Sequence, residues 1–302
     1  MSERLLLITA DDFGIGPETS RAILELASTG TITSTVLLVN SPFAAAAVQS
    51  WALAGKPVEL GWHPCLTLDA PVLPPDRVPS LVGPDGRLNP LGVFLKRLFW
   101  GQIRIDEVED ELRAQYKRFL ELVGRPPMNV NAHHHIHVFR MVGTALSRVL
   151  ASMSPKPFVR RVREPSRTLW YVPGARVKRS LLTAVGRSAA SRQAALDFPG
   201  NDTLIGITDP RYVHDPEFFA RWLKSARGQF VELCCHPGFP DHSLVGRDDD
   251  LTGRRPSELE LLRHPTFLDT VQAAGFRTVN AVQLISLRSC SSRATATTCR
   301  SH

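Results

Sequence analysis

The chain of 302 residues carries 36 basic and 29 acidic residues, a net charge of +7. Its composition of 43% hydrophobic and 22% charged residues is sufficient to form a buried core, which excludes a disordered, fibrous or collagen-like protein. No apolar run reaches the roughly 18 residues of a membrane span. The apolar stretch 5–10 ends at two acidic residues, so we expect a cytoplasmic protein without a signal peptide.

Strands and helices alternate along the chain. Residues 4–9 form an almost continuous apolar run, which is typical of a strand buried on both faces of a parallel sheet. Apolar residues at helical spacing follow Pro17 and end at Gly30. Further strands are predicted over 33–39, 58–62, 128–132, 158–162, 230–235 and 276–279. Further helices are predicted over 43–53, 105–123, 142–153 and 216–226, and one or two helices over 258–274. This order predicts an α/β fold of parallel strands joined by crossover helices, and the length suits one α/β barrel as well as two smaller domains.

Two segments interrupt this alternation. Residues 69–89 are rich in Pro and Gly, which predicts a long loop over the carboxyl ends of the strands. Residues 163–208 form a basic insertion. From residue 286 onward Ser, Thr, Arg and Ala follow one another without periodicity, so we expect one domain over 1–285 and a disordered tail over 286–302.

The positive charge is concentrated in the stretch 156–193, which contains ten basic residues and one acidic residue. Such a surface attracts phosphate, anionic lipid or nucleic acid, and the simpler alternative is a solvated surface of extended arginines. Because no aromatic-interleaved nucleic-acid motif accompanies the charge, we expect no nucleic-acid partner. Peripheral membrane contact through 156–193 stays open, and no surface pattern decides between a monomer and a homo-oligomer.

Acidic and histidine side chains follow the predicted strands at their carboxyl ends. Asp11 and Asp12 follow the first strand, His63 the third, the cluster 133–137 the strand over 128–132, and His236 the strand over 230–235. The carboxyl ends of the strands of an α/β barrel converge on one site, so these side chains are expected to meet. Acids and imidazoles gathered at one point predict a metal site with a base and an acid nearby.

A catalytic divalent cation takes about three protein ligands and keeps a position for water, which one Asp and two His would satisfy. If the chain stays extended through the cluster, His133, His135 and His137 share one face and His134 points away. One of the three would then bind metal while the others line a substrate cleft. The alternatives are an acidic helix cap, isolated buried histidines and adventitious metal binding by a loop.

Four segments together resemble the motifs of the YdjC-like carbohydrate deacetylases, a family that includes chitooligosaccharide and hopanoid-pathway deacetylases. They are TADDFGIG from Thr9, GWHPCLT from Gly61, NAHHHIH from Asn131 and CHPG from Cys235. The segments occur in the family's order, and the resemblance extends from about residue 4 to about residue 285. The joint occurrence of four motifs makes it specific.

The resemblance implies a distorted, incomplete (β/α) TIM-like barrel, built as a single domain with loop insertions. It also implies a bound divalent cation and hydrolysis of an N-acetyl group on an amino sugar. Carried over motif by motif, the roles are metal ligand for Asp12, His63 and His133, general base for Asp11 and general acid for His236. The candidate substrate-binding residues are His135, His137 and Arg160.

The sequence departs from the commoner family pattern at two positions. Asn131 stands where many relatives have Asp, although the Asn-Ala-His form resembles the hopanoid branch. This change removes a carboxylate behind a histidine ligand, and the loss of such a group lowers metal affinity. Pro64 stands where Leu is usual, which reshapes the wall of the cleft.

The sequence predicts the reaction but leaves several candidates for the metal and for the substrate. One carboxylate and two imidazoles suit Zn²⁺, the family's use of harder cations keeps Mg²⁺ an equal candidate, and Mn²⁺ or Co²⁺ are the others. The substrate is expected to be an N-acetylated oligosaccharide, such as one derived from chitin, or a glycolipid. The alternatives are a metal-dependent phosphoester hydrolase that holds phosphate with the arginine-rich insertion, and a non-catalytic protein that binds carbohydrate or lipid.

Overall fold

The computed structural model describes residues 3–207, 210–247, 251 and 253–287. Its strands are β1 (Arg4–Phe13), β2 (Ser34–Leu37), β3 (Glu59–Trp62), β4 (Asn129–Val130), β5 (Phe158–Val159), β6 (Thr203–Ile205), β7 (Phe230–Cys235) and β8 (Phe276–Thr278). They form one parallel sheet in the order β5-β4-β3-β2-β1-β7-β6, with β8 paired to the start of β1. The strands therefore all point their carboxyl ends the same way, as the sequence predicts.

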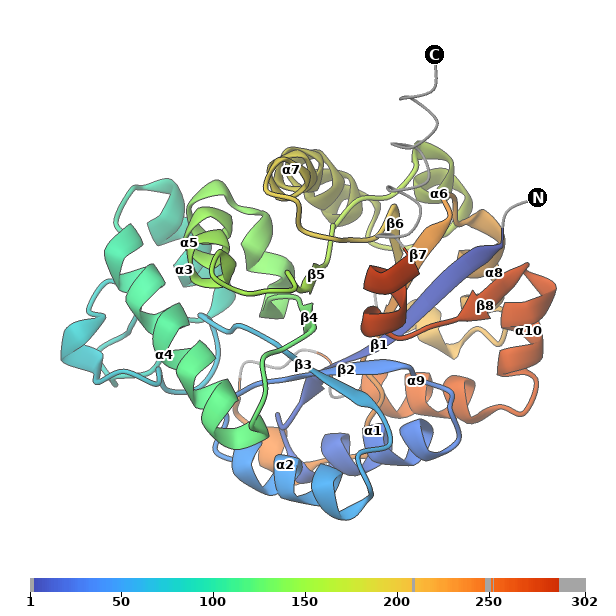
Figure 1. The fold of residues 1–302 in the computed structure, drawn as a ribbon, viewed down its shortest axis with the longest axis horizontal. Coiled ribbons are helices and arrows are strands. Elements are labelled where there is room, and N and C mark those ends of the chain that lie inside the picture. The colour runs from blue at the N-terminus through green and yellow to red at the C-terminus, as the bar shows by residue number, and fades with distance from the viewer. Residues whose placement is uncertain (1–2, 208–209, 248–250, 252, 288–302) are drawn as a thin grey trace.

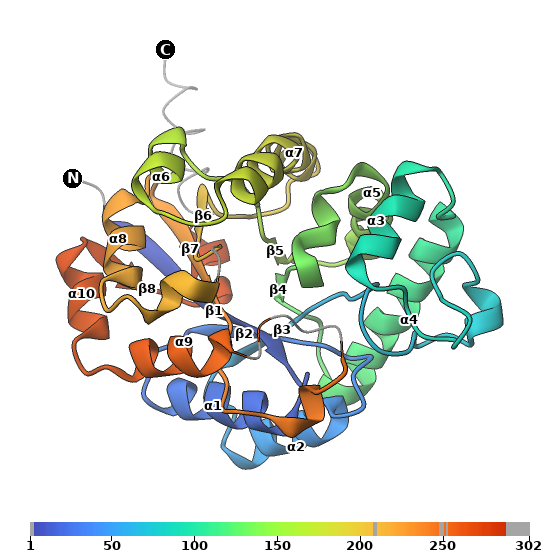
Figure 2. The same cartoon turned by 180° about the vertical axis from the view of Figure 1, so that it is seen from behind.

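Helices surround this curled sheet on its outer side (Figures 1 and 2). They are α1 (Pro17–Ser28), α2 (Ala44–Leu53), α3 (Leu91–Phe99), α4 (Ile105–Val123), α5 (Arg140–Leu150), α6 (Ser166–Tyr171), α7 (Arg176–Ala195), α8 (Phe218–Ser225), α9 (Arg254–Arg263) and α10 (Phe267–Ala273). Short 3-10 helices cover Pro75–Arg77, His133–Val138, Pro210–His214 and His242–Leu244. Over the described residues, the helices are too short or too polar to cross a bilayer.

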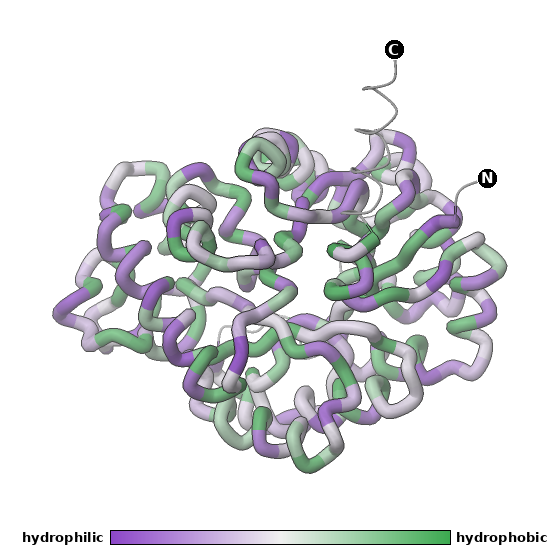
Figure 3. The backbone as a smooth tube through the Cα atoms, viewed as in Figure 1, coloured by the Kyte–Doolittle hydropathy of each residue, from purple (hydrophilic) through white to green (hydrophobic). Residues whose placement is uncertain are grey.

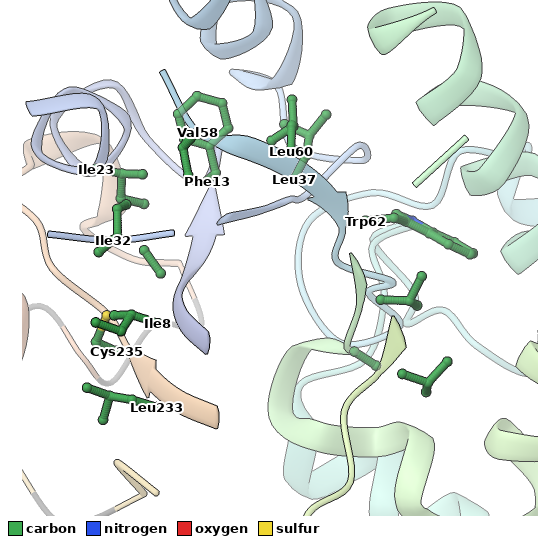
Figure 4. Packing of buried hydrophobic residues seen from close by; sticks show 14 of the residues in the cluster. Ile8, Phe13, Ile23, Ile32, Leu37, Val58, Leu60, Trp62, Leu233 and Cys235 are labelled. Atoms are coloured by element: carbon green, nitrogen blue, oxygen red, sulfur yellow. The ribbon is translucent and has the colours of Figure 1, made fainter. Parts of the chain in front are cut away.

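The core lies between the sheet and its helices. Strand β1 runs between β2 and β7 and is buried from Leu5 onward, which explains its unbroken apolar sequence. Hydrophobic stretches of the chain follow β1 and its neighbours (Figure 3). Figure 4 shows Phe13, Leu37 and Leu60 gathered in one part of this core, on three adjacent strands.

The sheet curls toward a barrel that is not closed by strand pairing. Among the described residues β5 and β6 share no ladder, and the chain beside them bridges the gap instead. The Val159 amide donates to the Pro199 carbonyl at 2.8 Å, and the Leu204 amide donates to the Arg163 carbonyl at 3.0 Å. The expectation of a distorted, incomplete (β/α) barrel is therefore confirmed.

Local boundaries differ from the sequence predictions in three places. Strands β4 and β5 have two residues each, so both are shorter than the strands predicted over 128–132 and 158–162. The stretch 258–274, predicted as one or two helices, forms two, and the first of them, α9, begins at Arg254 rather than at Glu258. The chain is helical over 281–287, so the predicted tail does not begin at 286, and the rest of that tail, 288–302, lies outside the described residues.

Candidate metal and catalytic site

Two consecutive carboxylates reach the site from the end of β1. Side chains of neighbouring strand residues normally point to opposite faces, but Asp12 has φ 67° and the pairing of β1 with β2 shifts register between Ala10 and Phe13. Asp tolerates this left-handed conformation better than most residues. Both Asp11 and Asp12 are buried and both contact site residues from other strands.

Asp12, His63 and His133 bring three candidate ligand atoms together. Asp12 Oδ1 lies 3.3 Å from His63 Nε2 and 3.0 Å from His133 Nδ1. One candidate ligand atom from each of the three residues lies within 4.8 Å of the other two. The other ring nitrogen of His63, Nδ1, lies 2.7 Å from the Asn131 carbonyl, which fixes Nε2 as the nitrogen with a lone pair. One carboxylate and two imidazoles, all buried, form a donor set that fits a divalent cation.

A buried arginine that the sequence analysis missed holds Asp12. Arg255 Nη2 donates to Asp12 Oδ2 at 2.7 Å, so the second carboxylate oxygen is tied back while Oδ1 faces the histidines. Burial alone would raise the pKa of Asp12, but the charges of Arg255 and His133 outweigh it and keep the pKa well below the usual range. The carboxylate is thus ionised, as a metal ligand must be.

Asp11 is held in the same way by Arg160, from the segment after β5. Arg160 Nη1 lies 2.6 Å from Asp11 Oδ2, and Arg160 Nη2 lies 2.9 Å from Asp11 Oδ1. The guanidinium also contacts Glu232 on β7, at 3.0 Å from Nε and 2.8 Å from Nη2. Arg160 was predicted to bind substrate, but its side chain is fully buried behind Asp11 and lines no cleft.

The charge of Arg160 determines the ionisation of Asp11. Burial tends to raise the pKa of Asp11, and the adjacent guanidinium more than reverses the effect, so the pKa lies below its usual range. Burial raises the pKa of Glu232, the second carboxylate on the same arginine. Glu232 interrupts the apolar run over 230–235, and a carboxylate in such a buried strand requires a partner. That interruption was the available sequence signal for this ion pair.

His236 lies on the open side of Asp11. Its Nε2 is 3.8 Å from Asp11 Oδ2, and its side chain is 16% exposed, compared with 2% for Asp11. The backbone amide of His236 donates to the buried carboxylate of Glu258, which fixes the chain at this point. Burial lowers the pKa of the His236 imidazole. The structure therefore brings His236 and Asp11 together, with His236 the more accessible of the two.

The histidine cluster is not extended, so the predicted alternation of its side chains is wrong. It forms a 3-10 segment in which His134 and His135 adopt left-handed φ values of 53° and 56°. His134, expected to point away, has its ring centroid 4.0 Å from that of His133 and its Nδ1 2.9 Å from Thr67 Oγ1. His134 therefore supports a candidate ligand directly.

The other two histidines of the cluster have different surroundings. His137 is buried, its Nε2 lies 3.0 Å from the Arg160 carbonyl and its Nδ1 accepts from the Ala132 amide, so both ring nitrogens already have partners. Both nitrogens serve the backbone that positions the site. His135 is half-buried, and its buried Nδ1 atom has no hydrogen-bond partner among the described residues.

A hollow of about 410 Å³ is lined by Thr67, by residues of the loop that follows β3 and by Arg247. Its lining includes Thr67, which contacts His134, and it continues along the predicted loop 69–89. The buried Asp69 carboxylate forms ion pairs with Arg87 and Arg247 at its wall. Arg247 also donates to a carbonyl of the loop that follows Asp12, so this hollow opens at the carboxyl ends of the strands.

Comparisons with known proteins relate most of the chain to one family. A family model described as YdjC-like protein matches residues 5–273. A chitooligosaccharide deacetylase of Serratia marcescens is 28% identical, covering 91% of this chain and 96% of its own length. A carbohydrate deacetylase of Enterococcus faecalis is 26% identical, covering 93% and 98%. A crystal structure of a putative cellobiose-phosphate cleavage protein of Enterococcus faecalis has the same fold, with a TM-score of 0.75, 24% identity and coverage of 94% and 99%.

Proposed function

Since the chain belongs to the YdjC-like protein family, we propose that it is a divalent-metal-dependent hydrolase that removes the N-acetyl group from an amino sugar. The observation that carries this proposal is the convergence of Asp12, His63 and His133 within 4.8 Å, beside the buried carboxylate of Asp11. The names of two relatives, a chitooligosaccharide deacetylase and a carbohydrate deacetylase, support the same reaction.

Asp12, His63 and His133 would hold the cation, with one donor atom each. Zn²⁺ and Mg²⁺ are the first candidates, with Mn²⁺ and Co²⁺ next, because carboxylate and imidazole donors accommodate each of them. A bound divalent cation lowers the pKa of water and polarises the acetamide carbonyl. Arg255 on Asp12 and the Asn131 carbonyl on His63 keep the donor atoms aimed at this point.

Asp11 and His236 would carry the proton from water to the leaving amine. Asp11 accepts a proton as the water oxygen attacks the acetamide carbon, and His236 donates a proton to the nitrogen as the C–N bond breaks. Asp11 Oδ2 and His236 Nε2 lie 3.8 Å apart, so the proton would return from Asp11 to His236 once the two atoms move to hydrogen-bond distance. The products are acetate and the free amino sugar. Arg160 acts as a positioning residue because it fixes both oxygens of Asp11.

The sugar would occupy the hollow that begins at Thr67. Its wall offers the carboxylate of Asp69, the guanidinium of Arg87 and the amide of Asn89, groups that hydrogen-bond to sugar hydroxyls. His135 is the member of the histidine cluster that we retain as a substrate contact. An oligosaccharide derived from chitin and the sugar of a glycolipid would both present such hydroxyls.

The decisive experiment is acetate release from a panel of N-acetylglucosamine oligomers and N-acetylated glycolipids, with and without a chelator. We expect acetate from at least one substrate, its loss on chelation and its recovery when a divalent cation is added back. Asp11→Asn protein serves as the control for contaminating deacetylase. Phosphate release from an artificial phosphoester without any acetate release would favour the phosphoester hydrolase. Metal binding without hydrolysis of any substrate would favour a non-catalytic binding protein.

A further inference from the structure

The insertion that contains α6 and α7 presents large apolar side chains to solvent. Trp170 is 76% exposed, Tyr171 53%, Val177 85% and Leu181 63%. We propose that this α6–α7 surface, formed by these four residues together with Arg167, Arg176, Lys178 and Arg187, docks the protein on an anionic lipid bilayer. The inference concerns an interaction surface and does not depend on the reaction proposed for the site.

The apolar residues of α7 lie on one face of the helix. Val177, Leu181 and Ala184 are spaced by four and three residues, which places them in one exposed stripe. The residues that α7 buries against the barrel include Arg179, Thr183 and Gly186, on the other side of the helix. The stripe is therefore not the face that packs on the core. A helix with such a stripe, flanked by basic residues and by Trp and Tyr, is typical of binding at a bilayer surface.

The outward position of this surface is fixed by buried contacts. Arg179 forms a buried ion pair with Glu164 at 2.7 Å and donates to the carbonyls of Val172 and Gly174, so α6, α7 and their connection form one unit. At Gly186 the helix approaches the Val162 carbonyl so closely that a Cβ atom would lie 1.7 Å from it. These buried contacts hold α6 and α7 in place, so the exposure of the apolar side chains is not the result of loose packing.

The charge of the surface selects the partner. Residues 165–196 contain no acidic residue, and the side chains of Arg167, Arg176, Lys178 and Arg187 are exposed around the apolar stripe. Two copies of the chain meeting at this surface would bring like charges together, whereas anionic headgroups would neutralise them while the apolar side chains enter the bilayer. Nucleic acid would neutralise the charges but would leave Val177 and Leu181 without an apolar environment.

The α6–α7 surface adjoins the candidate site. Helices α6 and α7 lie side by side at one rim of the barrel (Figure 2), and α7 contacts the 3-10 segment His133–Val138. Arg192 of α7 donates to the Val138 carbonyl at 3.3 Å. Docking would therefore bring the site close to the membrane surface. This position favours an N-acetylated glycolipid over a free oligosaccharide as the substrate. This last step alone rests on the proposed function.

The test is co-sedimentation of the full chain with vesicles of phosphatidylcholine alone or mixed with phosphatidylglycerol, at low and high salt. We expect binding to the mixed vesicles that weakens with salt, and a loss of about tenfold or more in the Trp170→Ser, Leu181→Ser double variant. Leu53→Ser is the matched control, because Leu53 is 82% exposed on α2 and should not affect binding. Unchanged thermal unfolding of the variants confirms that they are folded.

Four outcomes would overturn the proposal. The first is the absence of binding to mixed vesicles by folded wild-type protein, and the second is equal binding by the double variant. The third is assembly into dimers that the double variant abolishes, which would assign the surface to a second copy of the chain. Salt-sensitive binding of RNA that is as tight as vesicle binding, and unaffected by the double variant, would assign the charge to nucleic acid. None of these results depends on acetate release, so they are separate from the test of the reaction.

Discussion

Asp11 and Arg160 form a two-point ion pair in the interior of the barrel, with oxygen to nitrogen distances of 2.6 and 2.9 Å. Both oxygens of the carboxylate are thereby fixed by one planar guanidinium, which itself contacts Glu232 on its other side. A planar guanidinium that contacts both oxygens of a carboxylate fixes the orientation of the carboxylate and also stabilises its negative charge. The pair explains how a buried carboxylate can stay ionised beside the candidate metal ligands.

Replacing the planar guanidinium of Arg160 by the single ammonium group of lysine should therefore impair turnover. Arg160→Lys retains the positive charge but loses the second contact to Asp11, and we expect kcat to fall by about 10- to 100-fold with the metal retained. Arg179→Lys changes an equally buried arginine that pairs with Glu164 outside the site, and it should lower stability without a comparable loss of kcat. Equal kcat in Arg160→Lys and wild type would show that the two contacts from the Arg160 guanidinium do not position Asp11.

Asp11 itself should be required for turnover and not for metal binding. Asp11→Asn removes the proton acceptor while keeping the shape of the side chain, and loss of a general base costs about 10²–10⁴ in rate. Steady-state acetate release checks the rate. Turnover close to that of wild type would refute the role of Asp11 as general base.

His134 should matter more than its position in the sequence suggested. The extended-chain interpretation placed it away from the site, but its ring lies 4.0 Å from that of His133 and its Nδ1 contacts Thr67. We expect His134→Ala to weaken metal binding about tenfold, measured by titration with the metal, because His133 loses a supporting ring. His264→Ala, an exposed histidine elsewhere, is the control. Identical affinities in the two variants would restore the original interpretation.

A pH dependence of stability follows from Glu59, at the start of β3. Burial raises the pKa of Glu59 to about 7 from an ordinary value of 4.5, although the amides of Ala281 and Val282 donate to it. The folded chain therefore holds this proton more tightly than the unfolded chain does. As pH rises from 4.5 to 7, Glu59 should remove about 3 kcal/mol from the free energy of unfolding.

Denaturant unfolding at the two ends of this pH range checks the prediction. Glu59→Gln cannot ionise, so its free energy of unfolding should lose less than that of wild type between pH 4.5 and pH 7. The exposed Glu121→Gln should follow wild type. A Glu59→Gln protein whose stability falls with pH as steeply as that of wild type would contradict the assignment.

The sequence predicted the parts of the site that depend on strand order. Asp12 lies at the carboxyl end of β1, and His63 and His133 lie just beyond those of β3 and β4. Parallel pairing in one curled sheet is enough to bring such positions together. The long loop over 69–89 and the curled parallel sheet follow from the same reasoning. These features depend on the order of strands and helices, which the spacing of apolar residues in short stretches of the sequence indicates.

The supporting contacts were harder to predict because they join residues far apart in the chain. Arg160 was counted as part of a basic surface, yet it is buried against Asp11, and nothing near Arg255 in the sequence indicates its pairing with Asp12. The side-chain directions of His134 and His135 depend on left-handed backbone angles that no local pattern of histidines specifies. Glu232 alone gave a local signal, as a carboxylate within an apolar strand.

The most direct test of the metal site is the number of divalent ions bound per chain in matched variants. We predict one ion in wild type and in Asp11→Asn, none in His63→Ala, and one in the control His264→Ala, with acetate released by wild type and by the control. A wild-type protein that releases acetate at full rate after its metal has been removed, or a His63→Ala protein that keeps its ion, would contradict the account.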